Sequence, residues 1–206
     1  MGRMLETLQV FKTSGLFQTN TYVFKVGDGW FVVDPGKGVL DFLKNFLSQD
    51  VSLNVLLTHG HYDHIAGIPE LEYFNSLKIF ISEEDSPLLK DPNWNYSAPL
   101  GDPLVLEREW TNVDDYFNTI SAPGHTPGSR IIIFDGYVFT GDVVFSNTVG
   151  RWDLCPLPNA HELMVETIRR LSEAFRQLPN DWLILPGHGE VVTVGKLFSL
   201  NPFFKR

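Results

Sequence analysis

The chain has 206 residues, of which 43% are hydrophobic and 20% charged, and this length and composition predict a single domain spanning residues 1–206 with a well-buried core. Its formal net charge is −9 at pH 7, and its Lys and Arg residues are dispersed. A nucleic-acid surface needs a concentrated basic patch, so these features argue against nucleic acid and favour a small-molecule substrate.

The N-terminus and the cysteine content predict a cytoplasmic protein without a membrane anchor. Residues 1–7 lack the long apolar core of a signal peptide, and no later run approaches the roughly eighteen apolar residues of a membrane span. Cys155 is the only cysteine, which excludes an intrachain disulfide and a finger-type thiolate zinc site. Any bound metal must therefore use nitrogen and oxygen ligands.

Short apolar, β-branched or aromatic runs recur along the chain and predict strands. Asp28-Gly29 and Asp135-Gly136 each join two such runs, and each predicts an antiparallel hairpin because these residue types tolerate positive φ. The predicted strands cover residues 21–26, 30–33, 53–57, 77–81, 116–120, 130–134, 137–140 and 182–185.

Three segments predict helices. In the longest, the Asn159 side chain is expected to cap the first turn, with Glu162 completing a capping box, and apolar residues follow at helical spacing up to Leu178. Residues 39–47 and 195–200 predict two shorter helices. Together with the strands, they indicate an α/β sandwich.

Residues 82–110 contain four prolines and several Asp, Asn and Ser residues, with little periodicity except near residues 83–90. This composition predicts an irregular segment. Long ordered loops inside compact domains often carry function, so this segment is interpreted either as a functional loop or as a surface insertion. The sequence leaves both interpretations open.

Five of the six histidines lie in three short polar turns, each of which follows an apolar run. In His59-x-His61, alternate residues of an extended segment project to one side, so both imidazoles can reach a single ion. Asp63 and His64 follow where the chain is expected to enter a helix, and four ligands so close in sequence favour a second ion. A single Pro-Gly-His turn is usually only a turn, but the full set favours metal binding. The remaining ligands are expected to be His125, Asp142 and His188.

In residue type and order, this set resembles the full metal motif set of the metallo-β-lactamase superfamily. The resemblance implies a four-layer αββα sandwich with two metal ions at one edge. It implies that Asp34 is a carboxylate that orients the ligands, although Asp34 could simply end a strand. The implied ligands of one ion are His59, His61 and His125. The implied ligands of the other ion are Asp63, His64 and His188. The implied bridge between the two ions is Asp142, together with a water-derived hydroxide.

Further segments resemble the glyoxalase II-like hydrolases, which cleave S-lactoylglutathione, a hydroxyacylglutathione. The chain departs from the longer members of that family, which carry a C-terminal helical domain that supplies much of the glutathione-binding surface, because its sequence ends at Arg206. In the family, a basic residue near the position of Arg151 meets a glutathione carboxylate. The alternative is a structural pair between Arg151 and Asp153. The matching segments are 20–22, 33–36, 139–142, 150–151, 186–189 and 201–203.

Hydrolysis of a small thioester follows from this resemblance. Two ions lower the pKa of a shared water toward about 7, which yields a bridging hydroxide that attacks the carbonyl beside the catalytic carboxylates Asp63 and Asp142. Zinc is the expected ion, although these ligands also suit iron and manganese. Cys155 has no neighbouring base in sequence, so a packed or surface thiol is expected, and His161 is expected to be an exposed helix residue.

Three alternatives stay open. A persulfide dioxygenase of the same fold would hold one iron with His59, His125 and Asp142. A phosphodiesterase acting on RNA is disfavoured by the short chain and the negative charge. A catalytically silent binding module is disfavoured because every ligand position is filled. The sequence makes no prediction about the oligomeric state.

Overall fold

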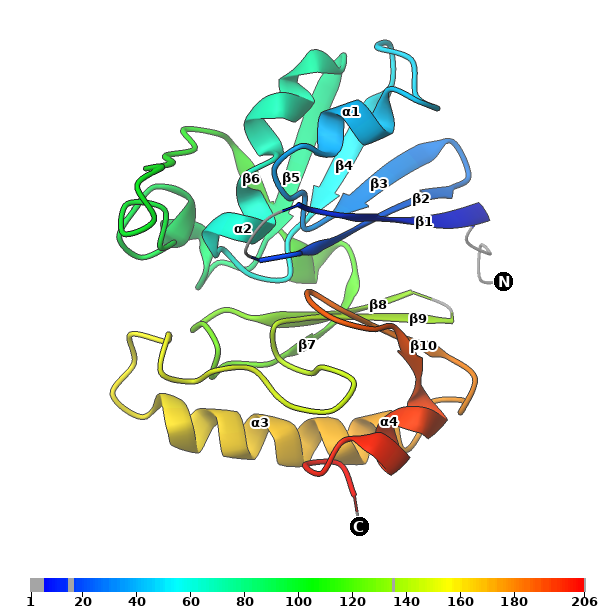
Figure 1. Ribbon diagram of the computed structural model, residues 1–206, viewed down its shortest axis with the longest axis vertical. Helices are drawn as coiled ribbons and strands as arrows, with labels where there is room; N and C mark the ends of the chain where they lie inside the picture. Colours follow the sequence, from blue (N-terminus) through cyan, green and yellow to red (C-terminus); the bar gives the residue numbers. More distant parts are fainter. Residues whose placement is uncertain (1–5, 15–16, 135, 206) are drawn as a thin grey trace.

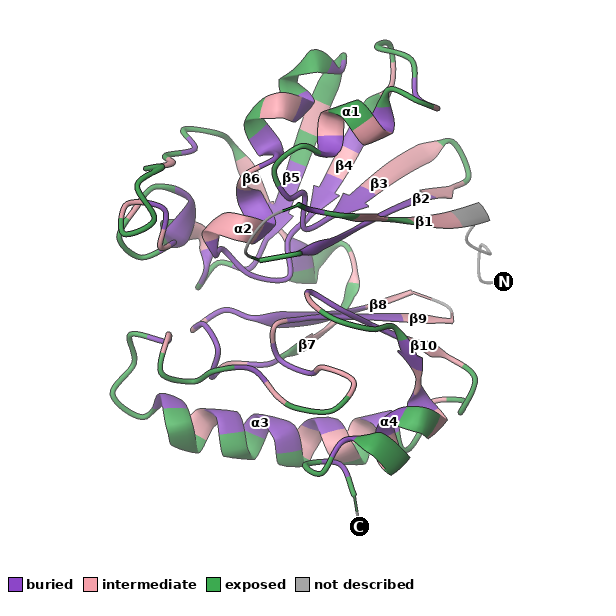
Figure 2. Cartoon of the chain, in the orientation of Figure 1, coloured by how far each residue is buried: buried purple, intermediate pink, exposed green. Residues whose placement is uncertain are grey.

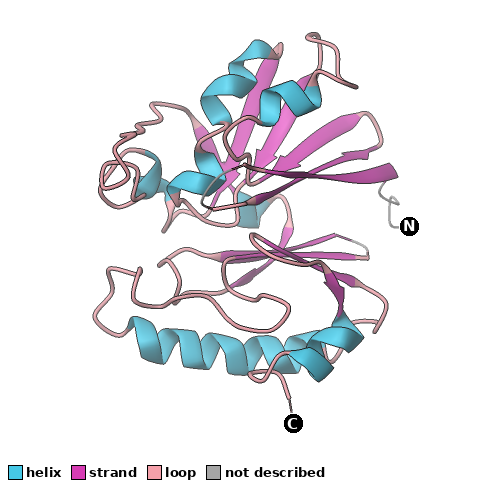
Figure 3. Cartoon of the chain, in the orientation of Figure 1, coloured by secondary structure: helices cyan, strands magenta, loops and turns pink. Residues whose placement is uncertain are grey.

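The computed structural model describes residues 6–14, 17–134 and 136–205, and within them two β-sheets face each other with helices on both outer faces (Figure 1). Within the described residues, one sheet has six strands in the order β1-β2-β3-β4-β5-β6. The other has five strands in the order β11-β10-β9-β8-β7. Figure 3 shows the two sheets next to each other, with helices outside each of them. The predicted four-layer αββα sandwich is confirmed.

The strands are short and meet in both parallel and antiparallel pairs. The first sheet contains β1 (Glu6–Lys12), β2 (Asn20–Val26), β3 (Gly29–Val33), β4 (Ser52–Leu56), β5 (Ser76–Ile81) and β6 (Trp110–Asn112). The second sheet contains β7 (Asn118–Ser121), β8 (Arg130–Phe134), β9 (Tyr137–Gly141), β10 (Leu183–Pro186) and β11 (Val192–Thr193).

The helices cover the outer faces or lie in the connections. The α-helices are α1 (Val39–Leu43), α2 (Tyr62–Ile65), α3 (Ala160–Phe175) and α4 (Val194–Leu200). The 3₁₀ helices are η1 (Ile68–Tyr73), η2 (Ser86–Leu89) and η3 (Val113–Asp115). Among the described residues, no helix combines the length and hydropathy needed to cross a bilayer.

Both predicted hairpins are antiparallel. Val26 pairs with Gly29 across the β2–β3 turn, and Phe134 pairs with Tyr137 across the β8–β9 turn. Gly136 has a φ of 87°, the positive value that its turn requires. Asp135, the other residue of that predicted turn, lies outside the described residues.

Successive side chains of the central strands enter different cores. Tyr22 and Phe24 of β2 pack between the two sheets, whereas Val23 packs in the core that the first sheet shares with α1 and η1. Phe24 stacks on Phe139 of the second sheet with ring centroids 5.5 Å apart, so aromatic rings join the two sheets. Figure 2 shows the buried residues of the strands in purple. The period-2 alternation of a strand thus fills two cores at once.

The helix predictions are correct in place but not in every detail. Asn159 stands at the N-cap of α3, yet its side chain accepts no hydrogen bond from the helix, so the predicted capping box is wrong. Its φ of −109° and ψ of 26° differ from the extended conformation that aims a capping side chain at the first turn. The predicted apolar stripe is buried up to Phe175, whereas Leu178 lies beyond the end of α3 and is partly exposed. The helix predicted over 39–47 ends at Leu43 and continues as hydrogen-bonded turns.

Candidate metal centre

The predicted ligands meet at one edge of the sandwich because their turns follow strand ends. Thr58–Asp63 leaves the end of β4, and α2 begins at Tyr62 within this turn, as predicted. β9 and β10 are parallel, so the residues after them, including Asp142 and His188, emerge on the same side. His125 lies in the connection between β7 and β8. Ligands from both sheets therefore converge on one place.

Three groups of side chains have the spacing of metal ligands: two are the predicted ligand groups, and the third is Asp34, His59 and His64. In each group the ligand atoms all lie within 4.8 Å of one another. The first group is His59, His61 and His125, and all three are buried. The second group is Asp63, His64 and His188.

Asp142 lies between the two groups. Its Oδ2 is 3.7 Å from His125 Nε2 of the first group and 3.3 Å from His188 Nε2 of the second. Its Oδ1 is 3.4 Å from His64 Nε2. A carboxylate with an oxygen facing each group has the position expected of a bridge.

Hydrogen bonds orient the rings of the first group. His125 Nδ1 lies 2.8 Å from the Arg151 carbonyl oxygen, which can only accept, so Nδ1 carries the proton and the Nε2 lone pair faces the site. The Thr58 hydroxyl donates to Asp34 Oδ2 at 2.6 Å and therefore accepts from His59 Nδ1 at 3.1 Å. His59 Nε2 is left with a free lone pair, whereas His125 Nε2 lies 2.9 Å from His61 Nδ1. Fixing the tautomer in this way prepares an imidazole for a metal ion.

Asp34 has the spacing of a metal ligand with His59 and His64, and it is also hydrogen-bonded to Thr58. Its two oxygens accept from the Thr58 N–H at 2.8 Å and from the Thr58 hydroxyl. Oδ2 also lies 3.0 Å from His64 Nδ1, at an angle that makes no hydrogen bond. Asp34 has a φ of 51°, a conformation that non-glycine residues rarely adopt and that is frequent at functional sites. We propose that this carboxylate orients the ligands, as the sequence predicts.

The unpaired polar atoms of the site fit divalent cations. Buried polar side-chain atoms without a hydrogen-bond partner are rare in proteins. Among the described residues, every such atom belongs to a predicted ligand. Imidazole nitrogens and carboxylate oxygens are suitable ligands for a divalent metal. The unpaired atoms are His59 Nε2, His64 Nδ1 and Nε2, Asp142 Oδ1 and His188 Nδ1.

The two groups differ in charge. Burial, with the neighbouring imidazoles, holds the pKa of His59 and His61 well below the ordinary value, and burial also lowers that of His125. These rings are neutral at pH 7, the form that binds metals. In the second group the carboxylates overcome the opposing effect of burial, raising the pKa of His64 well above its ordinary value and that of His188 to about 9. The second group therefore lies in a more negatively charged environment than the first.

Residues 82–110 form one wall of the site. The Tyr62 N–H donates to the Asn95 carbonyl at 2.8 Å, and the Tyr96 ring lies 5.2 Å from that of His61. Tyr96 has a φ of 68°, and its hydroxyl donates to the Leu154 carbonyl. These wall residues were not found from the sequence, because an irregular segment has no periodicity that reveals its contacts. Contact with the site favours the functional interpretation of this segment.

A cavity of about 260 Å³ opens over the two ligand groups. Arg151 lines it, but its guanidinium also donates to Asp153 at 3.0 and 2.5 Å, so the two alternatives for Arg151 are both present in the structure. Beyond the ligands themselves, the lining includes Phe17, Tyr62, Asn95, Tyr96, Pro99, Leu100 and Leu154.

The remaining histidine and the cysteine lie outside the site. His161 is exposed, as predicted, and its ring lies 5.1 Å from that of Trp152. Cys155 is buried, and burial raises the pKa of its thiol, which agrees with the prediction of a packed residue. An unreactive thiol is expected there.

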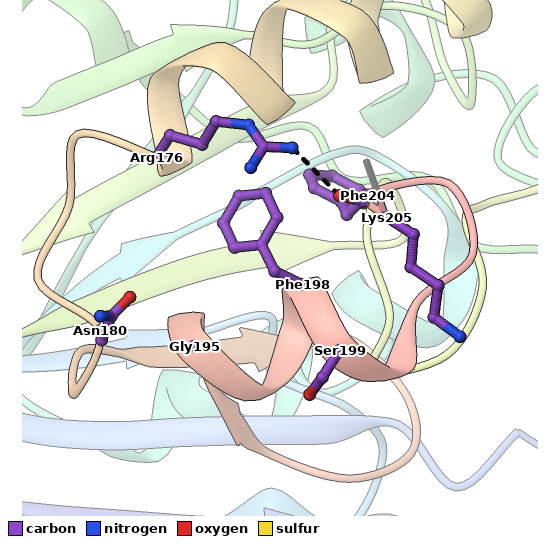
Figure 4. Close-up of a pocket in the computed structure, with 7 residues that line it drawn as sticks. All are labelled: Arg176, Asn180, Gly195, Phe198, Ser199, Phe204 and Lys205. Atoms are coloured by element: carbon purple, nitrogen blue, oxygen red, sulfur yellow. Dashed lines mark hydrogen bonds between the residues drawn. The ribbon is translucent and has the colours of Figure 1, made fainter.

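A larger cavity of about 640 Å³ lies beside the C-terminal end of α3 and is unrelated to the metal ligands. Figure 4 shows that Arg176 reaches across it to donate to the Phe204 carbonyl, at 3.3 Å. Its lining contains no histidine or carboxylate among the described residues. The seven lining residues are Arg176, Asn180, Gly195, Phe198, Ser199, Phe204 and Lys205.

The family model described as the metallo-β-lactamase superfamily matches residues 14–188. The chain belongs to the metallo-β-lactamase superfamily. This confirms the family predicted from the histidine turns, and the match runs from before β2 to the last predicted ligand.

Relatives within the superfamily cover nearly the whole chain. A hydroxyacylglutathione hydrolase, GloC, from Haemophilus influenzae is 31% identical over 187 residues, which are 84% of this chain and 85% of the relative. The crystal structure of the B3 metallo-β-lactamase BLEG-1 superposes with a TM-score of 0.80 at 26% identity, covering 97% of this chain and all of that one. A di-iron-bound form of TTHA1623 gives a TM-score of 0.73 at 27% identity, covering 94% of this chain and all of that one.

Proposed function

We propose that this chain is a dinuclear metal-dependent hydrolase of small thioesters of the hydroxyacylglutathione type. The observation that carries the proposal is the presence of two complete ligand groups on either side of Asp142. The 31% identity to a hydroxyacylglutathione hydrolase supports the choice of thioester. Zinc is the proposed ion, although the di-iron form of a similar protein keeps iron open.

The proposed ligands divide between the two ions as the sequence predicts. His59, His61 and His125 would hold the first ion, and Asp63, His64 and His188 the second, with Asp142 available to both. When bound, such a pair of ions activates a water molecule and polarises a substrate carbonyl. Because the Arg151 carbonyl and Thr58 fix the His125 and His59 rings, these ligands need little reorganisation.

The cavity suits a small acyl thioester. Its outer wall is largely apolar, from Phe17, Tyr96, Leu100 and Leu154, and its volume of about 260 Å³ holds only part of a glutathione thioester. Arg151 at the rim can meet a carboxylate. A thiol has a pKa near about 8.5 and leaves as a thiolate with little acid assistance.

The persulfide dioxygenase alternative is less consistent with the geometry. It would use one iron with His59, His125 and Asp142 and leave the second group idle. Yet Asp63 Oδ2 lies 3.2 Å from His188 Nε2 and 3.4 Å from His64 Nε2, and these atoms surround the same Asp142 carboxylate. A second group so compact favours two ions.

The substrate class is tested with a panel of acyl thioesters. Zinc-loaded protein is expected to release thiol from S-lactoylglutathione, detected by a thiol-reactive dye. His188→Ala should lower kcat/KM by at least about 100-fold, because losing a ligand costs more than losing the groups that orient one. Cys155→Ala, outside the site, is the control that keeps full activity. If no thioester in the panel is cleaved, the proposed substrate class is wrong.

A further inference from the structure

Asp85 is a completely buried carboxylate outside the predicted ligand set. It lies between β5 and η2, in the segment 82–110. Its Oδ2 accepts from the Gly60 N–H at 3.1 Å and from the Thr126 hydroxyl at 2.7 Å. Its Oδ1 accepts from the Gly128 N–H at 2.6 Å. One side chain therefore bonds to two turns that are distant in the sequence.

These two turns carry all three ligands of the first group. Gly60 separates His59 from His61, and Thr126 directly follows His125. The other peptide N–H that flanks His61, from Tyr62, donates to the Asn95 carbonyl of the same segment. The segment 82–110 thus holds the backbone on both sides of His61.

The packing around Asp85 is tight enough to fix the distance between the turns. A Cβ at Gly60 would lie 2.6 Å from Leu88 Cβ, and a Cβ at Gly128 would overlap Ser82 Oγ. Ser82 also donates from its hydroxyl to the Gly128 carbonyl, at 2.7 Å. Because glycine alone allows this approach, the backbone near Asp85 is in direct contact with both turns.

The second ligand group has a different support. Asp63 accepts from the Thr19 hydroxyl at 2.7 Å, and Thr19 comes from the connection between β1 and β2. The hydrogen bonds of Asp85 go to residues 60, 126 and 128, beside the first group. Asp34 lies beside both groups, but the hydrogen bonds of Asp85 reach only the turns of the first group, and that of Thr19 reaches only the second.

We propose that Asp85 is a positioning residue that holds the His59–His61 turn against the His125 turn and so sets the metal affinity of the first ligand group. The inference rests on the proposed dinuclear centre and deepens it. Groups that orient metal ligands typically contribute 10- to 100-fold to affinity. Loss of Asp85 therefore weakens the binding of one ion and leaves the binding of the other unchanged. Loss of a merely structural carboxylate would instead lower the overall stability of the protein.

The test is calorimetric titration of zinc into the metal-free protein. His61→Ala identifies which binding step belongs to the first group. Asp85→Asn is expected to weaken that step by about 10- to 100-fold and to change the other by less than about 3-fold. Thr19→Val should weaken the binding step of the second group, because Thr19 donates to Asp63. Glu84→Gln, a neighbouring exposed carboxylate that pairs with Arg130 instead, should change neither.

Two further variants keep the test decisive if Asp85→Asn does not fold. Thr126→Val removes one hydrogen bond to Asp85 and should weaken the first-group step, while Thr126→Ser keeps the hydroxyl and should restore it. Unchanged steps in Asp85→Asn would overturn the inference. Equal weakening of both steps, with a lower melting temperature of the metal-free variant, would also overturn it. If the unaltered protein bound no zinc, the proposed function itself would fail.

Discussion

At the residue scale, Arg151 contributes to the site through two different atoms. Its carbonyl oxygen orients the His125 ring, and its guanidinium lines the cavity while paired with Asp153. A substitution that removes the side chain leaves the carbonyl in place. The two contributions can therefore be separated by mutation.

We expect Arg151→Ala to raise KM for S-lactoylglutathione by about 5- to 10-fold and to leave kcat within about 2-fold. The loss corresponds to about 1–1.4 kcal/mol, a modest value because Asp153 already holds the guanidinium. Steady-state kinetics check this, with Arg151→Lys as the variant that keeps the charge. A KM that does not change in Arg151→Ala would assign the side chain to the Asp153 pair alone.

At the scale of secondary structure, the central strands could be predicted and several edge strands could not. β2, β3, β4, β8 and β9 are largely apolar because side chains on both of their faces pack in a core. The strands missed from the sequence, β1, β6 and β11, all lie at the ends of their sheets. β6 and β11 have three and two residues, too few for a period-2 pattern. Such short edge strands are recognised by their hydrogen bonds to the neighbouring strand, which the sequence pattern does not reveal.

The helix caps give a matched test at this scale. Thr193 at the N-cap of α4 accepts from the Lys196 N–H at 3.2 Å, whereas Asn159 at the N-cap of α3 accepts nothing from its helix. Thr193→Ala should lower the free energy of unfolding by about 1 kcal/mol, and Asn159→Ala by less than about 0.5 kcal/mol. Chemical denaturation of both variants measures the difference. An equal loss in the two variants would mean that Asn159 caps α3 in solution.

At the scale of the whole molecule, the proposed metal centre lies between the two sheets and draws residues from both. The ligands from His59 to His64 follow β4 of the first sheet, and His125, Asp142 and His188 come from connections of the second. The aromatic contact of Phe24 with Phe139 also crosses between the sheets. Both features support the proposal that residues 1–206 form one domain.

The clustering of the candidate ligands could be predicted from the sequence, but their surroundings could not. Histidines in three polar turns after apolar runs form a pattern whose chemistry is readable without coordinates. Tyr96 and Asp85 belong to an irregular segment whose position depends on tertiary packing, exemplified by the approach of Leu88 to Gly60. The sequence therefore predicts the metal chemistry, while the walls and supports of the site require the fold.

The central claim, a centre of two ions, is tested most directly by the metal content of zinc-reconstituted protein after dialysis, measured by inductively coupled plasma mass spectrometry. The unaltered chain should retain two zinc ions, and His61→Ala and His188→Ala should each retain about one, because each removes one ligand from a different group. A single ion per unaltered chain, with no further loss in His188→Ala, would contradict the dinuclear centre.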